Sequence, residues 1–207
     1  MGTRLSRGTK NTVRGKLLRV SEVLVTELPT TPLHGIGRST PAPPYNAKQR
    51  AELYSWSRTR GTDPGRRDAA VLLVLGFGFG AGLATRELLA VRRRDIADDA
   101  STFRVRDARR RTVPLDDQWQ AVLQRALDEH DPDDWAFRPG RHSASSGQVA
   151  DFVRRTATDL DIRPARMRST WLCQRLEQDI AVATLLAQSG LQTYAALDRY
   201  RSFLPVS

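Results

Sequence analysis

The sequence predicts a mainly helical fold with one small β-hairpin. Apolar residues recur at helical spacing along residues 163–203, 116–130 and 148–160, with charged residues between them. Residues 102–106 and 110–114 favour two short strands joined by a tight turn. Hydrophobic residues make up 40% of the 207 residues, which is enough for one good core. These observations exclude a fully disordered chain.

The first 28 residues are expected to form a basic amphipathic helix. Apolar side chains recur at spacings of four, three and four residues from Val13 to Leu24. Three basic residues lie beside this stripe: Arg14, Lys16 and Arg19. Eleven of the 33 Lys and Arg lie in residues 1–60, beside three of the 23 Asp and Glu. This asymmetry favours a polyanionic partner, with nucleic acid as the first candidate.

A proline-rich linker is expected to follow, because residues 29–44 contain five prolines. The main domain is then expected to span residues 45–207, with a first helix at residues 47–60. Residues 69–79 are compatible with a buried helix or a strand. The glycines that follow do not have the G-x-G-x-x-G spacing of a dinucleotide site, and no repeated strand and helix units accompany them.

The remaining elements follow from caps and periodicity. Asp116 is expected to cap the helix at residues 116–130, and Trp135 to Phe137 form a short strand segment. Pro164 can open a helix at its first turn, residues 180–186 suit a second short helix, and residues 191–203 a third.

Several classes of protein and site are excluded by composition. The single cysteine, Cys173, cannot form an intramolecular disulfide, and the chain begins without a secretory signal. The longest apolar run, residues 69–84, is too short for a good membrane span. His130 and His142 lack companions at a metal-binding spacing, so no metal site and no cofactor are expected. We expect a soluble cytoplasmic protein with no membrane partner.

Residues 82–96 carry a resemblance to a known family. They read G-L-A-T-R-E-L-L-A-V-R-R-R-D-I and resemble the first arginine box of the tyrosine recombinase (phage integrase) family, G-L-R-x-x-E-L-L-x-L-x-x-x-D-I. The hairpin ending at Val113-Pro114-Leu115 and the helices of residues 163–203 follow in the family's order. The resemblance implies a DNA breaking-rejoining catalytic-domain fold over residues 45–207. It also makes the helix expected in residues 1–28 similar to one helix of the family's core-binding domain. The alternative, given equal weight, is a helix that simply packs on the main domain.

The positions that would carry the chemistry are only partly retained. Arg168 falls on the family's second catalytic arginine and Tyr200 on its nucleophile. Three positions depart from the pattern, since Ala84 replaces the first arginine, Ala165 the first histidine, and Gln188 a histidine or tryptophan. The family's hairpin lysine is also missing, and an arginine cannot readily give up a proton in its place.

The resemblance implies a recombinase-like protein that binds double-stranded DNA in recombination or integration, with degenerate catalysis and a nucleoid-associated location. Its partners would include a second copy of itself or another recombinase subunit. The candidate DNA contacts are Arg14, Lys16, Arg19, Arg92, Arg93, Arg94, Arg109, Arg110, Arg111 and Arg166. Two alternatives stay open. One is an active, divergent recombinase that uses Tyr200, and the other is a protein-interaction module that does not bind DNA.

Overall fold

The computed structural model describes residues 9–10, 12–14, 16–17, 40–59, 78–106, 109–145, 147–155 and 159–204. The chain divides into two compact units, Met1–Thr40 and Pro41–Ser207. In the first unit, the described residues between 9 and 17 are helical. Most of the expected N-terminal helix, most of the linker and nearly all of the expected element at residues 69–79 lie outside the described residues.

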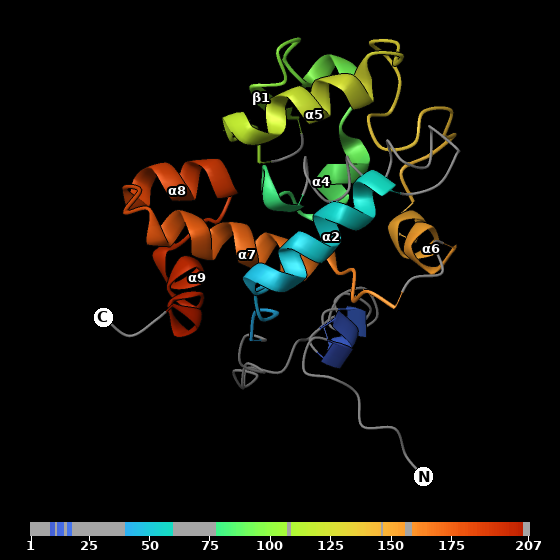
Figure 1. Ribbon diagram of the computed structural model, residues 1–207. Coiled ribbons are helices and arrows are strands. Elements are labelled where there is room, and N and C mark those ends of the chain that lie inside the picture. Colours follow the sequence, from blue (N-terminus) through green and yellow to red (C-terminus); the bar gives the residue numbers. More distant parts are fainter. Residues whose placement is uncertain are drawn as a thin grey trace. The chain divides into compact units, whose positions relative to one another are not determined.

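The second unit is mostly helical with one two-stranded antiparallel sheet (Figure 1). Its elements are α2 (Ala47–Thr59), α4 (Thr85–Ala90), η2 (Arg93–Asp95), β1 (Thr102–Val105), β2 (Arg111–Pro114), α5 (Asp117–Leu127), α6 (Gln148–Arg155), α7 (Pro164–Glu177), α8 (Val182–Ser189), α9 (Tyr194–Asp198) and η3 (Arg201–Phe203). The predicted fold class, mainly helical with a small hairpin, is confirmed.

Helix α7 is the centre of the core. Pro164 stands in its first turn, where a missing N–H costs nothing. The side chains of Met167, Trp171 and Leu172 are almost completely buried, as their helical spacing requires. The chain entering α2 is attached to this helix, because the N–H of Tyr45 donates to Thr170 Oγ1 over 2.8 Å.

The β-hairpin pairs Phe103 with Val113 and Val105 with Arg111. Phe103, Val105 and Val113 are buried, whereas Arg104 and Thr112 are exposed. Side chains of a strand alternate between its two faces, so one face of the hairpin lies on the core. Helix α8 packs against β2, and this contact brings the end of α8 over the inner face of the hairpin.

Three elements differ from their prediction. The helix expected at residues 191–203 is divided into α9 and η3, with Tyr200 between them. Asp116 occupies the N-cap position of α5, but its side chain makes no capping hydrogen bond and instead forms an ion pair with Arg175. Residues 135–137 do not form the expected strand segment, and Trp135 makes an isolated bridge with Arg92. None of the described helices is long and apolar enough to cross a membrane.

Candidate functional site

Glu87 lies at the centre of the candidate site, in the first turn of α4. Its Oε2 accepts the backbone N–H of Ala84 over 2.8 Å, as in a capping box. The side chain of Glu87 is only 1% exposed, although a carboxylate is rarely buried without a charged partner. Leu88 and Leu89 beside it are buried, whereas Arg86 points to solvent. The box at residues 82–96 therefore presents an acid, and not an arginine, to the interior.

Arg111 of β2 provides the main partner of Glu87. Its Nη1 and Nη2 lie 2.9 and 3.0 Å from Glu87 Oε1 and Oε2, which is a bidentate pair. Its Nε donates to the carbonyl oxygen of Gln188 at 2.7 Å. The side chain of Arg111 is 6% exposed. Arg111 therefore joins the hairpin to α4 and to the end of α8.

Arg168 approaches the same carboxylate from α7. Its Nη1 donates to the carbonyl of Gly82, and its Nη2 donates to that of Ser189 at 2.7 Å. Arg168 Nη1 lies 3.9 Å from Glu87 Oε2. Burial lowers the pKa of Arg168, while the charges of Glu87 and Tyr200 act in the opposite direction. Glu87, Arg111 and Arg168 form what we call the buried charge network, with a net charge of +1.

Ionisation of Glu87 is stabilised by this network. Burial alone would raise its pKa, but hydrogen bonds from Arg111 and Ala84, together with the charges of Arg111 and Arg168, hold the pKa below its ordinary value. The carboxylate therefore stays ionised at neutral pH. Its single negative charge is shared between Arg111 and Arg168, so the carboxylate does not neutralise both guanidinium groups.

Gly190 permits the close approach of Arg111. It ends α8 in the left-handed conformation, with φ of 67°. A Cβ at this position would lie 2.8 Å from Arg111 Nη1. A side chain here would displace the guanidinium from Glu87, so the glycine serves both the turn and the network.

Tyr200 is half-buried between α9 and η3. Its backbone N–H donates to the carbonyl of Leu197 at 2.9 Å. Its side chain lies within electrostatic range of Arg168. The structure therefore brings Arg168 and Tyr200 into one region.

The three departing positions surround this region in different ways. Ala84 is half-buried and caps α4, with Glu87 on its backbone N–H. Ala165 is exposed in the first turn of α7. Gln188 contributes its carbonyl oxygen to Arg111, while its buried Oε1 accepts no hydrogen bond from the described residues. No general acid of the histidine type stands at any of these positions.

The three consecutive arginines of the box, residues 92–94, make contacts within the protein. Arg92 stacks on Trp135, with 4.1 Å from its Cζ to the ring centroid. Arg93 Nη1 donates to the carbonyl of Ile96 at 3.1 Å, and Arg94 forms an ion pair with Asp133. These contacts position the three side chains without a nucleic acid, and their contact with DNA stays a prediction.

Arg166 is held even more firmly. Its guanidinium lies 4.1 Å from the centroid of the Tyr45 ring and pairs with Asp161 at 2.7 Å. It also donates to the carbonyls of Pro43 and Pro44. The geometry assigns Arg166 a structural role in attaching the start of the second unit to α7. DNA contact by this residue stays a prediction.

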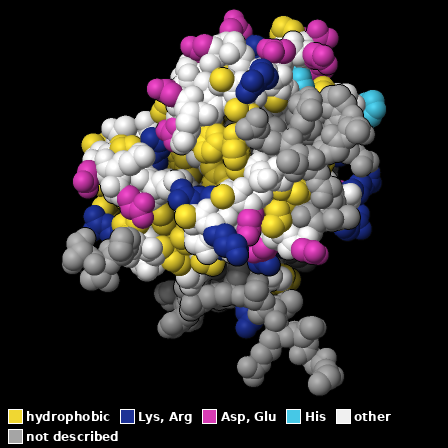
Figure 2. Space-filling model, in the orientation of Figure 1, with side chains coloured by type: hydrophobic (Ala, Val, Ile, Leu, Met, Phe, Trp, Pro, Cys, Tyr) yellow, Lys and Arg dark blue, Asp and Glu magenta, His cyan; other side chains and the backbone are white. Residues whose placement is uncertain are grey.

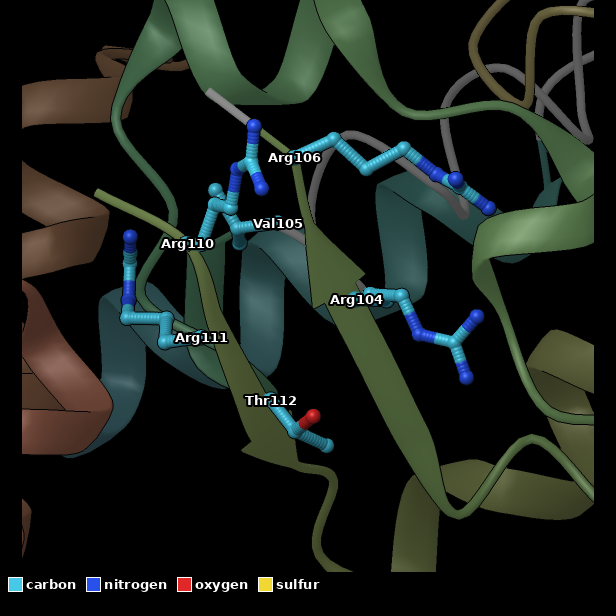
Figure 3. A pocket seen from close by; sticks show the side chains of 6 residues that line it. All are labelled: Arg104, Val105, Arg106, Arg110, Arg111 and Thr112. Carbon is cyan, nitrogen blue, oxygen red and sulfur yellow. The ribbon is translucent and has the colours of Figure 1, made fainter. Parts of the chain in front are cut away.

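The outer face of the hairpin is strongly basic (Figure 3). A hollow of about 570 Å³ is lined by Arg104, Val105, Arg106, Arg110, Arg111 and Thr112. Figure 3 shows the side chains of Arg104 and Arg106 extending to one side of the hairpin and that of Arg111 to the other. Arg109 and Arg110 are exposed. Of the three consecutive arginines proposed as DNA contacts, 109 and 110 face solvent and 111 is committed to the interior.

In the first unit, Arg14 is half-buried and Lys16 is exposed, both in helical residues. Arg19 lies outside the described residues.

Figure 2 shows Lys and Arg side chains scattered among acidic ones on the face in view, with an apolar area at its centre. No group of three or more His, Cys, Asp or Glu that could hold a metal ion occurs in the part of the chain that the structure describes.

Sequence reasoning missed the role of Glu87 and the inward direction of Arg111. A signal for Arg111 was present, because it lies two residues before the apolar Val113 and therefore on the same face of the strand. Glu87 directly precedes the apolar Leu88 and Leu89, and an acid that is buried with them needs a cationic partner.

Comparison with solved structures identifies the fold. The crystal structure of XerA recombinase has a TM-score of 0.60 at 16% identity, covering 95% of this chain and 72% of that one. The Tn1549 transposon integrase in complex with circular intermediate DNA has a TM-score of 0.61 at 15% identity, covering 98% and 76%. The XerH site-specific recombinase bound to its difH substrate has a TM-score of 0.64 at 13% identity, covering 95% and 62%.

No protein-family model matches the sequence. No curated protein matches it either. At identities of 13–16%, the structural similarity establishes the fold. The second unit has the mainly helical fold, with a two-stranded antiparallel sheet, of the tyrosine recombinase catalytic domain.

Proposed function

We propose that this chain is a recombinase-like DNA-binding protein that acts in DNA recombination or integration with degenerate catalysis. The observation that carries the proposal is the buried charge network, which occupies the place where the family's first arginine box meets its second arginine. One arginine, Arg168, remains beside Tyr200, and the second cation of the site, Arg111, is neutralised by Glu87. The fold shared with DNA-bound recombinases supports DNA as the partner.

Strand transfer needs more than this site offers. The charge that develops on a phosphate in the transition state is usually stabilised by two guanidinium groups, and removal of one such group costs about 10³-fold or more in rate. The Nη1 and Nη2 donors of Arg168 already bind the carbonyls of Gly82 and Ser189. A proton donor for the leaving oxygen is also required, and a guanidinium does not serve. A phosphate at Arg168 would have to compete with these two carbonyls, so the site is poorly built to cleave it.

DNA affinity should fall steeply with salt. If the basic residues contact about six or more phosphates, the association constant for a duplex should drop about 10³-fold or more between 50 and 200 mM salt, because counterions are released on binding. Fluorescence anisotropy with a labelled mixed-sequence duplex measures this. Absence of binding at the lowest salt would remove the proposal and favour the protein-interaction module.

Covalent trapping tests the catalytic part. Incubation with nicked suicide duplexes should yield no covalent protein–DNA adduct on a denaturing gel. Ala84→Arg restores the missing guanidinium and serves as the matched variant, while Tyr200→Phe removes the phenol. An adduct that forms with the unmodified chain and disappears in Tyr200→Phe would contradict degenerate catalysis.

The second candidate function is an active, divergent recombinase. It is favoured by one observation, the placement of Tyr200 within electrostatic range of Arg168. The same trapping experiment decides between the two candidates.

A second copy of this chain, or another recombinase subunit, is the proposed protein partner. Cross-linking on a duplex carrying two binding sites tests it.

A further inference from the structure

A cluster of positive charge lies away from the buried charge network, where the loop between α5 and α6, gold in Figure 1, meets the chain that follows α4. The backbone N–H of Arg93 donates to the carbonyl of Asp134, and that of Ala136 donates to Val91. These hydrogen bonds fix the loop against the end of the box.

Trp135 of this loop is stacked between two arginines. The Cζ of Arg92 lies 4.1 Å from the centroid of its ring, and the Cζ of Arg141 lies 4.7 Å away. The indole Nε1 donates to the carbonyl of Arg141 at 3.1 Å. The two guanidinium groups are thereby held in place by an aromatic side chain and not by an acid.

Arg141 is anchored by neutral acceptors. Its Nη2 donates to the carbonyl of Leu89 at 2.8 Å, and its Nη1 donates to Gln148 Oε1 at 2.6 Å. Its Nε is buried and has no hydrogen-bond partner among the described residues. A buried charged donor without an acceptor is costly, so the surrounding residues leave the charge of Arg141 incompletely compensated.

The acids nearby are already engaged with other arginines. The carboxylate of Asp133 pairs with Arg94, and the guanidinium of Arg92 donates to the backbone carbonyl of Asp133 and not to its carboxylate. The carboxylate of Asp95 pairs with Arg106 and also accepts the backbone N–H of Arg92. Among the described contacts, no carboxylate pairs with the guanidinium of Arg92 or Arg141.

A third arginine adds to this excess of charge. Burial first, and then the charges of Arg138 and Arg92, lower the pKa of Arg141 to about 10. No acid contributes to this shift in the opposite direction. Arg138 is partly exposed, and its side chain forms no hydrogen bond or ion pair with the described residues. We call Arg92, Arg138 and Arg141 the arginine cluster.

We infer that the arginine cluster binds a phosphodiester group of the DNA backbone, at a second contact separate from Arg168. A phosphate offers several acceptor oxygens, and arginine binds such groups through paired N–H donors. The cluster also lies beside the start of α6, where Arg141 contacts Gln148, and helix N-termini favour anions. The identity of the phosphate as DNA rests on the proposed function.

The test uses the full chain and a mixed-sequence duplex. Arg138→Gln removes one cluster charge that has no internal partner, and Arg125→Gln removes an exposed charge on α5 as the matched control. Arg138→Gln should reduce the magnitude of the slope of log affinity against log salt by about 0.9. Between 0.1 and 1 M salt, the affinity of the variant should therefore fall about eightfold less than that of the unmodified chain. Arg125→Gln should leave the slope unchanged, and Arg138→Lys should retain it.

The outcomes separate the cluster from the proposed function. Equal slopes for the unmodified chain and Arg138→Gln, with DNA binding intact, would overturn the inference and leave the proposed function standing. A chain that binds no duplex would overturn both. Titration with inorganic phosphate, followed by NMR of the Arg141 Nε–H, provides the second arm. A saturable shift in a chain that ignores DNA would assign the cluster to free phosphate and overturn the DNA assignment.

Discussion

Replacement of Glu87 by glutamine should lower the free energy of unfolding by about 3–5 kcal/mol, because it leaves two buried arginines without their shared counter-charge. Glutamine retains the shape of the side chain and one acceptor oxygen, so the loss reports charge and not a cavity. Urea denaturation followed by tryptophan fluorescence measures the change. Glu177→Gln, an exposed acid on α7, is the matched control and should change stability by no more than about 0.5 kcal/mol.

A double-mutant cycle identifies the partner. The variant Arg111→Met removes the bidentate donor of Glu87. In the double variant Glu87→Gln with Arg111→Met, the loss in free energy of unfolding should be smaller than the sum of the two single losses. The coupling should reach about 1–3 kcal/mol, since the two side chains touch at 2.9 and 3.0 Å. Strict additivity would show that Glu87 and Arg111 do not stabilise the fold as a pair.

The same network predicts a dependence on pH. The folded-state pKa of Glu87 is below its ordinary value, so its stabilising contribution is present above the unfolded pKa and is lost as pH falls through the folded one. The stability of the unmodified chain should therefore drop below about pH 4.5, the unfolded value. Glu87→Gln should lose less stability over this acidic range, because it has no proton to take up there.

Gly82→Ala should be the most damaging single methyl addition in the box, with a loss of about 2–4 kcal/mol. The position has φ of 55°, which disfavours a side chain, and a Cβ would lie 2.5 Å from Trp171 Cδ2 in the core. Because Arg168 donates to the Gly82 carbonyl, a displaced backbone would also disturb the candidate site. Thermal unfolding should report a lower Tm.

Gly140→Ala separates the two causes. Gly140 also has positive φ, 78°, but a Cβ there would have no neighbour within 4 Å. It should lose about 1–2 kcal/mol from backbone strain alone. Equal losses at the two positions would mean that contact with Trp171 contributes nothing.

The local elements were predictable from local patterns. Helix α7 begins at Pro164 as expected, and the hairpin strands β1 and β2 lie within the predicted ranges of residues 102–106 and 110–114. Where prediction failed, a distant residue competed with the local one. Asp116 was expected to cap α5, but its carboxylate pairs with Arg175, 59 residues away.

The candidate site was predictable only in part. The resemblance of the box to the tyrosine recombinase pattern predicted that Ala84 stands where that pattern has an arginine. The partners of Arg168 could not be inferred, because its two backbone acceptors belong to Gly82 and Ser189, which are 86 and 21 residues away. The spacing of Arg111 and Val113 could indicate which of the three consecutive arginines turns inward, but not that its partner is Glu87, 24 residues away.

By itself the sequence determined the helical periodicities and the hairpin, since these depend on neighbouring residues. The tertiary structure decided which charges are buried together. Packing of α8 on β2 places Arg111 against Glu87, and α7 brings Arg168 to the same carboxylate. Electrostatic energy depends on distance and burial in space, and neither can be read from spacing along the chain.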